Sequence, residues 1–394
     1  MSPILSILIP TKDREFYLMD IITYILTWKS EQFELIIQDN SENDNLAKEI
    51  EPLLNDSRLK YFHTTSWLSV IDNFELAINN SSGKVITMIG DDDGILEQTV
   101  LVAKWMLKND IEAVLPKRGE YTWPDLIGSF NSDYYNSKLR IEKVFTCEPK
   151  RVDVKEELSK VLKAGGCTLA ELPRLYYGLI TKDTLDKVKS AAGRYFPGPS
   201  PDMANAASAA IAVDKFIKLD FPLFISGSCT NSGSGMGVQR RHEGEIDKLP
   251  HLPKNCKQDW ECTLPLFWSG PTVWAESLIK ALKGMNSLNE LTEFNYSYLF
   301  ARCLVFNFNR KKDIFEAMQN SRLSKYHPKV WYYYLVIWWL RVETLFPKLL
   351  SKVLRKDDPS QLVIADKDKI SDAMHSLSTY LKTNKIELFF KNEH

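Results

Sequence analysis

The stretch VITMIGDDDGIL, residues 85–96, places three consecutive aspartates directly after a run of apolar, largely β-branched residues. A short apolar run of this kind is typical of a strand that is covered on both faces of a sheet. Three adjacent carboxylates repel one another, and the repulsion is relieved by water, by a cation or by protonation of one of them. The aspartates therefore form either a solvated turn or a metal site.

The same pattern continues along the first 116 residues, where short apolar runs alternate with longer amphipathic segments. This spacing is that of β–α units in a parallel sheet. We predict an α/β fold, with helices on both faces of a mostly parallel, Rossmann-like sheet and a mainly helical C-terminal region. The predicted strands cover residues 4–9, 33–38, 59–63, 84–89 and 111–116, and a later strand covers residues 174–180. The predicted helices between them cover residues 15–28, 44–54, 67–80 and 95–109.

Bulk composition excludes several classes of protein. The 394 residues include 50 Lys+Arg and 51 Asp+Glu, for a formal charge of -1, so no overall basic field indicates a nucleic-acid partner. The six cysteines contain no C-x-x-C pair, which argues against a zinc cluster and against a disulfide framework. The first residues lack a basic region and a cleavage site, so we expect no signal peptide and a cytoplasmic protein.

In a parallel sheet, ligands bind beyond the carboxyl ends of the strands. This rule selects four polar loops, at residues 10–14, 39–44, 63–67 and 90–94. Mg²⁺ and Mn²⁺ prefer oxygen ligands, and Mg²⁺ commonly combines one or two carboxylates with the phosphates of a substrate. A diphosphate would complete such a site at the aspartates.

Four segments in this order resemble the family 2 glycosyltransferases: SILIPTKDR (6–14), a strand ending in Asp39, the stretch from Val70 to Leu96, and PSPDMANAASAA (199–210). The resemblance covers residues 4–245. It implies a GT-A fold, a D-x-D motif for a nucleotide-sugar, and inverting transfer in the synthesis of bacterial surface polysaccharide. It also implies a glycosyltransferase domain at residues 1–250, with a nucleotide-binding half (1–116) and an acceptor-binding half (117–250), before a helical domain at 251–394.

The resemblance assigns the donor nucleotide to the early loops. Pro10, Thr11 and Arg14 would surround it, and Asp39 would accept a hydrogen bond from its base, taken as uracil. Asn73 would help to hold the donor. Two alternatives stay open, because Asp39 could cap a helix and Asn73 could be a residue on a helix surface.

The resemblance assigns the chemistry to carboxylates. Asp91, Asp92 and Asp93 would be the D-x-D motif, with Asp92 near the ribose or sugar and Asp93 on the Mn²⁺ or Mg²⁺ ion. An inverting transferase also needs a base for the acceptor hydroxyl. The family has an acidic pair at the start of a helix, where this sequence has the single carboxylate of Asp202, which could instead be a helix N-cap.

A Ser/Gly-rich segment ends in two arginines and a histidine at residues 240–242. By the same resemblance, His242 would be a further metal ligand, and Arg241, beside Arg240, would neutralise the leaving diphosphate. The alternative for His242 is an ordinary surface residue.

An aromatic stretch at residues 326–356 lies outside the resemblance. Its apolar part, 330–340, is shorter than the roughly 20 residues that span a bilayer. Its tyrosines, tryptophans and flanking lysines favour a peripheral contact with the inner face of the cytoplasmic membrane, and packing within the domain or in a homo-oligomer is the alternative.

We therefore expect a metal-dependent, inverting glycosyltransferase of the hexosyl type (EC 2.4). It would move a sugar from a nucleoside-diphosphate sugar, taken as a UDP-sugar, to a hydroxyl of a glycan or lipid-linked glycan. The alternatives are a nucleotidyltransferase and a non-catalytic glycan-binding scaffold. A D202N variant discriminates among them, because only the transferase needs a base near the anomeric carbon.

Overall fold

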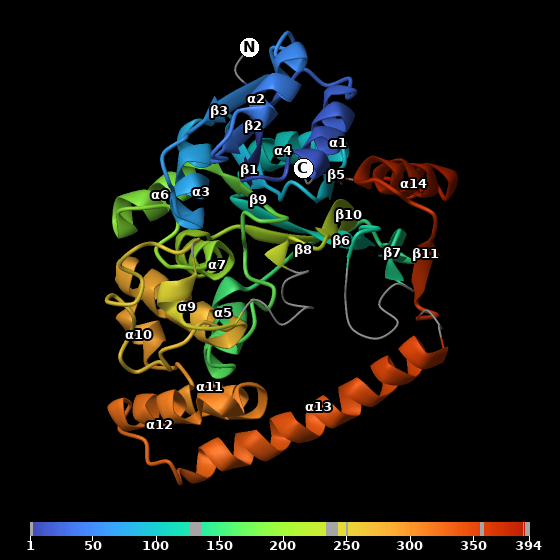
Figure 1. The fold of residues 1–394 in the computed structure, drawn as a ribbon. Coiled ribbons are helices and arrows are strands. Elements are labelled where there is room, and N and C mark those ends of the chain that lie inside the picture. The colour runs from blue at the N-terminus through green and yellow to red at the C-terminus, as the bar shows by residue number, and fades with distance from the viewer. Residues whose placement is uncertain are drawn as a thin grey trace.

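The computed structural model describes residues 3–126, 135–233, 243–249, 251–354, 358–388 and 390. These residues form an α/β fold around one sheet (Figure 1). The strands are β1 (Leu5–Thr11), β2 (Phe33–Asp39), β3 (Leu59–His63), β4 (Val85–Met88), β5 (Gly94–Ile95), β6 (Ala113–Thr122), β7 (Lys138–Glu142), β8 (Pro149–Arg151), β9 (Leu179–Thr181), β10 (Phe216–Ser228) and β11 (Gln361–Ile364).

Helices follow most of these strands. They are α1 (Glu15–Leu26), α2 (Asn45–Ile50), α3 (Val70–Asn79), α4 (Gln98–Lys108), α5 (Val154–Lys163), α6 (Lys182–Ala192), α7 (Pro201–Ala212), α9 (Gly270–Gly284), α10 (Leu288–Leu291), α11 (Tyr296–Phe306), α12 (Lys311–Asn320), α13 (Pro328–Leu354) and α14 (Ile370–Thr383). Short 3₁₀ turns lie at η1 (Glu51–Leu53), η3 (Ile246–Lys248) and η4 (Phe308–Arg310). The predicted fold class, with its mainly helical C-terminal region, is confirmed.

The N-terminal part of the sheet is parallel and has the strand order β3-β2-β1-β4. Side chains of β1 alternate between two cores, since Leu5, Ile7 and Ile9 pack on the side of α1 and α4, whereas Leu8 packs on the side of α3 and α7. Both faces of these strands are covered by helices, which is why the strands read as continuous apolar runs in the sequence.

The later strands make the sheet mixed. β9 lies between β4 and β6 and is antiparallel to both, and β10 is parallel to β6 but antiparallel to β5 and β8. The predicted strand at 174–180 is wrong for residues 174–178, because the regular strand begins at Leu179. Tyr177 has a φ of 58°, a left-handed conformation that a strand cannot contain.

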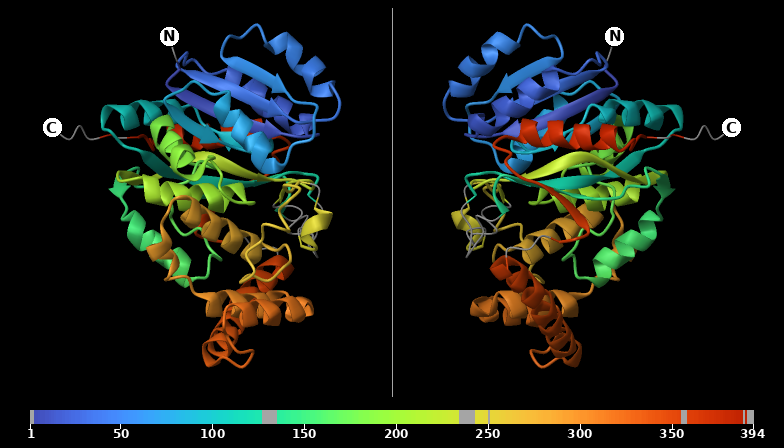
Figure 2. Two further views of the ribbon diagram at one scale, coloured as in Figure 1. Left: turned by 90° about the vertical axis from the view of Figure 1, so that its left-hand side faces the viewer. Right: turned by 90° about the vertical axis from the view of Figure 1, so that its right-hand side faces the viewer.

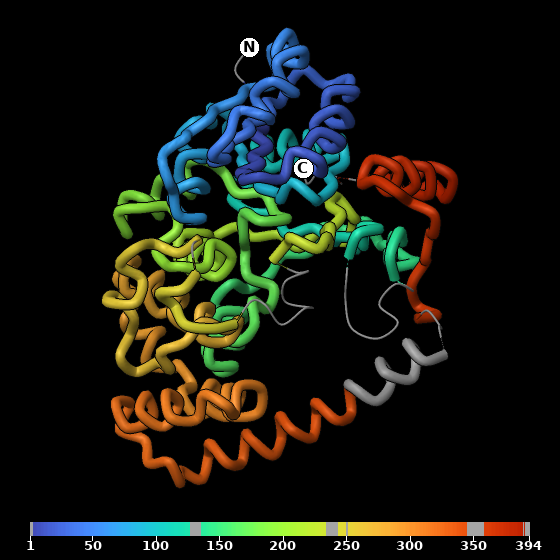
Figure 3. The backbone as a smooth tube through the Cα atoms, in the orientation of Figure 1, coloured from blue at the N-terminus to red at the C-terminus, as the bar shows by residue number. Residues whose placement is uncertain are grey.

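The end of the chain returns to the sheet. After α13, strand β11 pairs with β7, and α14 lies beside α1, where Ser371 hydrogen-bonds Asp20 at 2.8–2.9 Å (Figures 1 and 3). Helices α11, α12 and α13 lie at the end of the molecule opposite β1–β3 (Figure 2). The division of the chain at residue 250 stays a prediction, but segments from both sides of it share the sheet and its cores.

Candidate functional site

The predicted site lies where the parallel strand order reverses. β2 and β4 flank β1 on opposite sides, and in open α/β sheets ligands bind beyond the carboxyl ends of the strands at such a point. Thr11 is the last residue of β1, and Asp91 comes three residues after the end of β4. The hydroxyl of Thr11 donates a 2.7 Å hydrogen bond to Asp91, which joins the ends of these two neighbouring strands.

Arg14 joins two of the three aspartates. One end of its guanidinium lies 2.9 Å from Oδ1 of Asp91, and the other end lies 3.2 Å from Oδ2 of Asp92. Burial disfavours the cation, but the two carboxylates outweigh this effect and raise the pKa of Arg14. The same guanidinium donates to the sulfur of buried Cys229 at 2.9 Å. Sequence reasoning missed Cys229, because a single cysteine 215 residues from Arg14 gives no signal.

Asp93 is held in a different way. Each of its carboxylate oxygens accepts two hydrogen bonds. Oδ2 accepts from Gly90 N (2.6 Å) and from the Tyr176 hydroxyl (3.0 Å). Oδ1 accepts from the Tyr177 hydroxyl (2.7 Å) and from Gly227 N (2.8 Å). A substituent at Gly227 would collide with the backbone of the aspartate loop, since an added Cβ would lie 1.8 Å from a carbonyl oxygen. Asp93 therefore ties β4, the segment at 174–178 and β10 together.

Charge is crowded at this cluster. All three aspartates are buried, and burial raises the pKa of each. Burial and then the neighbouring Asp93 raise the pKa of Asp92 to about 7. One nearby arginine does not balance three carboxylates, so additional positive charge would stabilise the cluster.

The oxygens present fit a hard cation. Asp91 Oδ1 and Asp92 Oδ2 are buried without an aligned hydrogen-bond donor, and both face Arg14. Carboxylate oxygens are the ligands that Mg²⁺ and Mn²⁺ prefer. Among the described residues, no three or more His, Cys, Asp or Glu side chains are grouped to hold a metal. Further ligands would therefore have to come from elsewhere, such as a bound diphosphate.

The predicted nucleotide residues line the ends of β1 and β2. Pro10 pairs with Gln38 in the β1–β2 ladder. Asp39 is buried and accepts hydrogen bonds from Ser41 and from the Tyr61 hydroxyl. It caps no helix, since the N-cap of α2 is Asp44. The helix-cap alternative for Asp39 is therefore wrong.

Asn73 is also buried. Its amide donates to the carbonyl oxygens of Thr11 and Gln38, both at 3.3 Å. The alternative of a helix-surface residue is therefore wrong. These contacts place Asn73 behind the last residues of β1 and β2, where it supports the loops predicted to hold the nucleotide.

Asp202 lies near the segment at 174–178, where its charge acts on Arg174 and Tyr176. It is in the first turn of α7, and the N-cap position belongs to Ser200, so the N-cap alternative for Asp202 is wrong. The helix is tied to the segment by a 2.7 Å hydrogen bond from Leu175 N to Asn205. Burial raises the pKa of Asp202, although the charges of Arg174 and Arg118 oppose this shift.

Sequence reasoning also missed the arginines and tyrosines around Asp202. Arg118 lies over the ring of Tyr177, 4.9 Å from its centroid. Burial, and then the charge of Arg118, lowers the pKa of Arg174 to about 10. The predicted strand at 174–180 includes Tyr176 and Tyr177, and its local pattern gives no signal for their hydrogen bonds to Asp93. Arg240, Arg241 and His242 lie outside the described residues.

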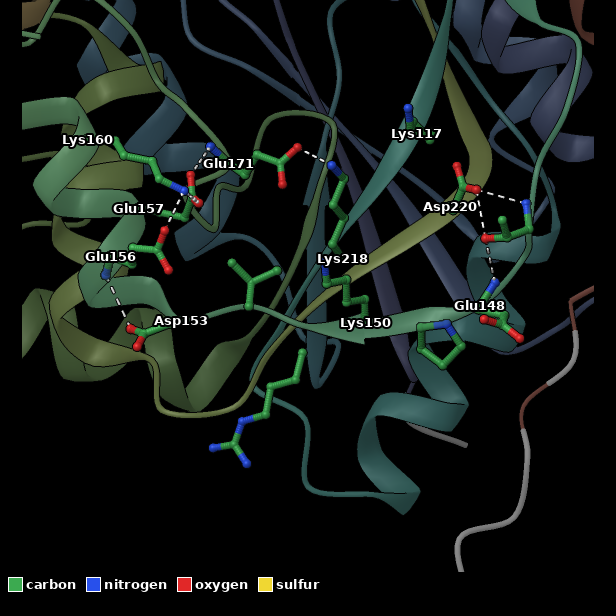
Figure 4. A pocket seen from close by; sticks show the side chains of 14 residues that line it. Lys117, Glu148, Lys150, Asp153, Glu156, Glu157, Lys160, Glu171, Lys218 and Asp220 are labelled. Carbon is green, nitrogen blue, oxygen red and sulfur yellow. Dashed lines mark hydrogen bonds and ion pairs between the residues drawn. The ribbon is translucent and has the colours of Figure 1, made fainter.

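A cavity of about 860 Å³ lies elsewhere, between α5, β8 and β10 (Figure 4). Charges of both signs line it and pair with one another, as in Lys218 with Glu171 and Lys160 with Glu157. Of the described residues predicted to form the site, none lines this cavity. The charge pairing leaves little net attraction for an anionic ligand.

Comparison with known proteins finds similarity to glycosyltransferases, mainly in the first part of the chain. Among solved structures, S. aureus TarS 1–349 in complex with UDP-GlcNAc is similar, at 13% identity and a TM-score of 0.49, over 96% of this chain and 92% of that chain. The same protein in complex with UDP is also similar, at 12% identity and a TM-score of 0.44, over 96% of this chain and 91% of that chain.

A curated protein, glycosyltransferase GlyG of Streptococcus pneumoniae serotype 4, is 20% identical over 150 residues, or 36% of this chain. The matched part of this chain covers 50% of the length of that relative. Residues 6–154 match the model of glycosyl transferase family 2. Over that range the chain is similar to family 2 glycosyltransferases, which confirms the resemblance drawn from its motifs for residues 6–154.

Proposed function

We propose that the protein is an inverting, metal-dependent glycosyltransferase that uses a nucleoside-diphosphate sugar, with UDP as the nucleotide. The acceptor would be a hydroxyl of a glycan or lipid-linked glycan in surface-polysaccharide synthesis. The family match over residues 6–154 supports the reaction class. The observation that carries the proposal is the buried cluster of Arg14, Asp91 and Asp92 at the point where the parallel strand order reverses.

The donor would lie along the ends of β1, β2 and β4. Asp39 would receive the base, and Pro10, Thr11 and Asn73 would shape the loop beneath the nucleotide. Asp91 and Asp92, each with one buried oxygen (Oδ1 and Oδ2, respectively) that lacks an aligned donor, would hold Mn²⁺ or Mg²⁺. Asp93, the ligand expected from the sequence, stays a candidate, although each of its oxygens already accepts two hydrogen bonds. When bound, the cation would neutralise charge on the diphosphate.

Asp202 would act as the general base. As the acceptor oxygen forms a bond to the anomeric carbon, the bond from that carbon to the diphosphate oxygen breaks, and its electron pair leaves with the nucleoside diphosphate. The acceptor proton passes to the Asp202 carboxylate. The raised pKa of Asp202 makes it a stronger base than an exposed carboxylate, which suits this role. Arg241 and His242 remain proposed ligands of the leaving group and of the metal.

Nucleotide binding, pyrophosphate release and sugar transfer test the proposal. Calorimetry with UDP and with GDP, with and without Mn²⁺, should show metal-dependent binding of UDP that D92N abolishes. Binding of neither nucleotide under any condition would favour a non-catalytic scaffold. Release of pyrophosphate from a nucleoside triphosphate would favour a nucleotidyltransferase.

Transfer from UDP-hexoses should fall by about 10²–10⁴-fold in D202N while UDP binding is unchanged. D183N is the matched control, because Asp183 also lies in the first turn of a helix but is exposed on α6. Transfer by D202N at the wild-type rate would show that another group is the base.

A further inference from the structure

Helix α13 has one apolar face that packs against the protein. Val330 and Ile337 are buried in the same core as α9 and α11. The rings of Tyr333 and Tyr298 lie 5.4 Å apart, and Arg341 donates a 3.0 Å hydrogen bond to the carbonyl oxygen of Val305 at the end of α11. These contacts attach α13 to the fold.

The opposite face of α13 is also apolar, and it is exposed. Tyr332, Leu335 and Trp339 are 64%, 65% and 67% exposed and recur at the i, i+3, i+7 spacing that places side chains on one side of a helix. Trp338 and Leu340 flank them and are about half exposed. The outer face of a surface helix is ordinarily polar, and a contiguous exposed apolar patch marks an interaction surface.

The patch lies in a basic part of the chain. Residues 306–344 contain seven Lys/Arg and three Asp/Glu, whereas the whole chain has a formal charge of -1. Arg322, Lys325 and Lys329 are exposed at the start of α13 and just before it. Positive charge beside exposed tryptophan and tyrosine is the combination that binds the interfacial region of an anionic bilayer.

We propose that the exposed face of α13, with Lys325 and Lys329 beside it, docks the protein on the surface of an anionic lipid bilayer. The helix would lie in the plane of the interface, because no helix in the described parts of the chain is long and apolar enough to cross a membrane. A second copy of the chain is a poorer occupant. A two-fold contact would bring two surfaces of the same net positive charge together, and like charges repel.

Vesicle flotation tests the proposal without any need for catalytic activity. The full chain is mixed with vesicles of phosphatidylcholine containing phosphatidylglycerol, and with vesicles of phosphatidylcholine alone. The wild type should float with the anionic vesicles, and the bound fraction should fall as salt is added. L335E/W339E should reduce this binding at least about tenfold, because each change places a charge in the apolar face.

The matched control is L101E/V144E, which adds the same two charges at exposed apolar residues away from α13 and should bind as the wild type does. K325E/K329E should lower binding to anionic vesicles by about tenfold or more. Thermal unfolding of each variant establishes that it is folded, since both members of each pair are exposed.

Failure of the wild type to bind anionic vesicles would overturn the proposal, as would unchanged binding by folded L335E/W339E. Light scattering without lipid measures whether the protein is a monomer or a dimer. A dimer that L335E/W339E converts to a monomer, with no effect on vesicles, would assign the patch to a second copy and would also overturn the proposal.

Discussion

The hydroxyl of Tyr177 donates a 2.7 Å hydrogen bond to Oδ1 of Asp93, although 84 residues separate the two in the sequence. Tyr177 has a left-handed backbone, with a φ of 58°. A bulky residue adopts this conformation only where the surrounding structure holds it, and such positions cluster at functional sites. The bond connects the end of β4 to the segment that carries Tyr176 and precedes β9.

Replacing Tyr177 by Phe keeps the ring and removes this donor. We expect the free energy of unfolding, measured in urea, to fall by about 1.5–3 kcal/mol, because a hydrogen bond to a buried carboxylate is lost. Y195F is the control, since the Tyr195 hydroxyl donates to Asp186, whose side chain is 51% exposed. That loss should stay below about 1 kcal/mol. Equal losses in the two variants would contradict the anchoring role of Asp93.

Asn substitutions should separate the roles of Asp92 and Asp93. D93N should lower the free energy of unfolding by at least about 2 kcal/mol, because the amide NH₂ would face groups that are themselves donors. D92N should change it by less than about 1 kcal/mol, since Asp92 faces Arg14, which also contacts Asp91. If D92N were the more destabilised variant in urea, the assignment of Asp93 as the anchor would be wrong.

The raised pKa of Asp202 predicts a pH dependence of stability. The folded state binds this proton more tightly than the unfolded chain does, so Asp202 lowers stability as the pH rises above its unfolded pKa of about 4. D202N should therefore unfold at a higher temperature than the wild type at neutral pH. The difference should vanish below about pH 4. A lower midpoint for D202N at neutral pH would mean that the arginines hold Asp202 ionised.

The proposed role of Asp202 as the general base gives a second prediction from its raised pKa. Activity should fall as the pH drops through a value above the ordinary carboxyl range, because the protonated carboxyl cannot accept the acceptor proton. The pH profile of kcat/KM for the wild type measures this value. An acidic limb at the pKa of an exposed carboxylate would contradict the environment described for Asp202.

Packing of α14 on β5 can be tested by a double-mutant cycle. A Cβ added at Gly94 would lie 2.9 Å from Cγ and 3.0 Å from Sδ of the buried Met374. G94A should cost about 1–3 kcal/mol of unfolding free energy, and M374A about 2–4 kcal/mol. The double variant should lose less than the sum by at least about 0.5 kcal/mol, because the shorter side chain leaves room for the added methyl group. Strict additivity would mean that the two residues do not meet in solution.

Some expectations from the sequence failed for identifiable reasons. The segment at 174–178 has the apolar and aromatic composition of a strand, but the left-handed Tyr177 breaks the ladder before Leu179. The cap alternative for Asp39 rests on the acidic loop that precedes α2, but the helix begins at Asn45 and its N-cap is Asp44. In each case a tertiary hydrogen bond, to Asp93 or from Tyr61, competes with the local preference.

By itself, the sequence determined the parallel strands β1–β4, the helices between them and the position of three aspartates at a strand end. These features follow from local periodicity, because a strand covered on both faces must be apolar along its length. Only the tertiary structure decided which carboxylates are available to a ligand. Three of the four hydrogen-bond partners of Asp93 come from residues 83, 84 and 134 positions away, and those of Asp91 come from residues 77 and 80 positions away. Such contacts depend on how distant segments meet, and no pattern of neighbouring residues encodes that meeting.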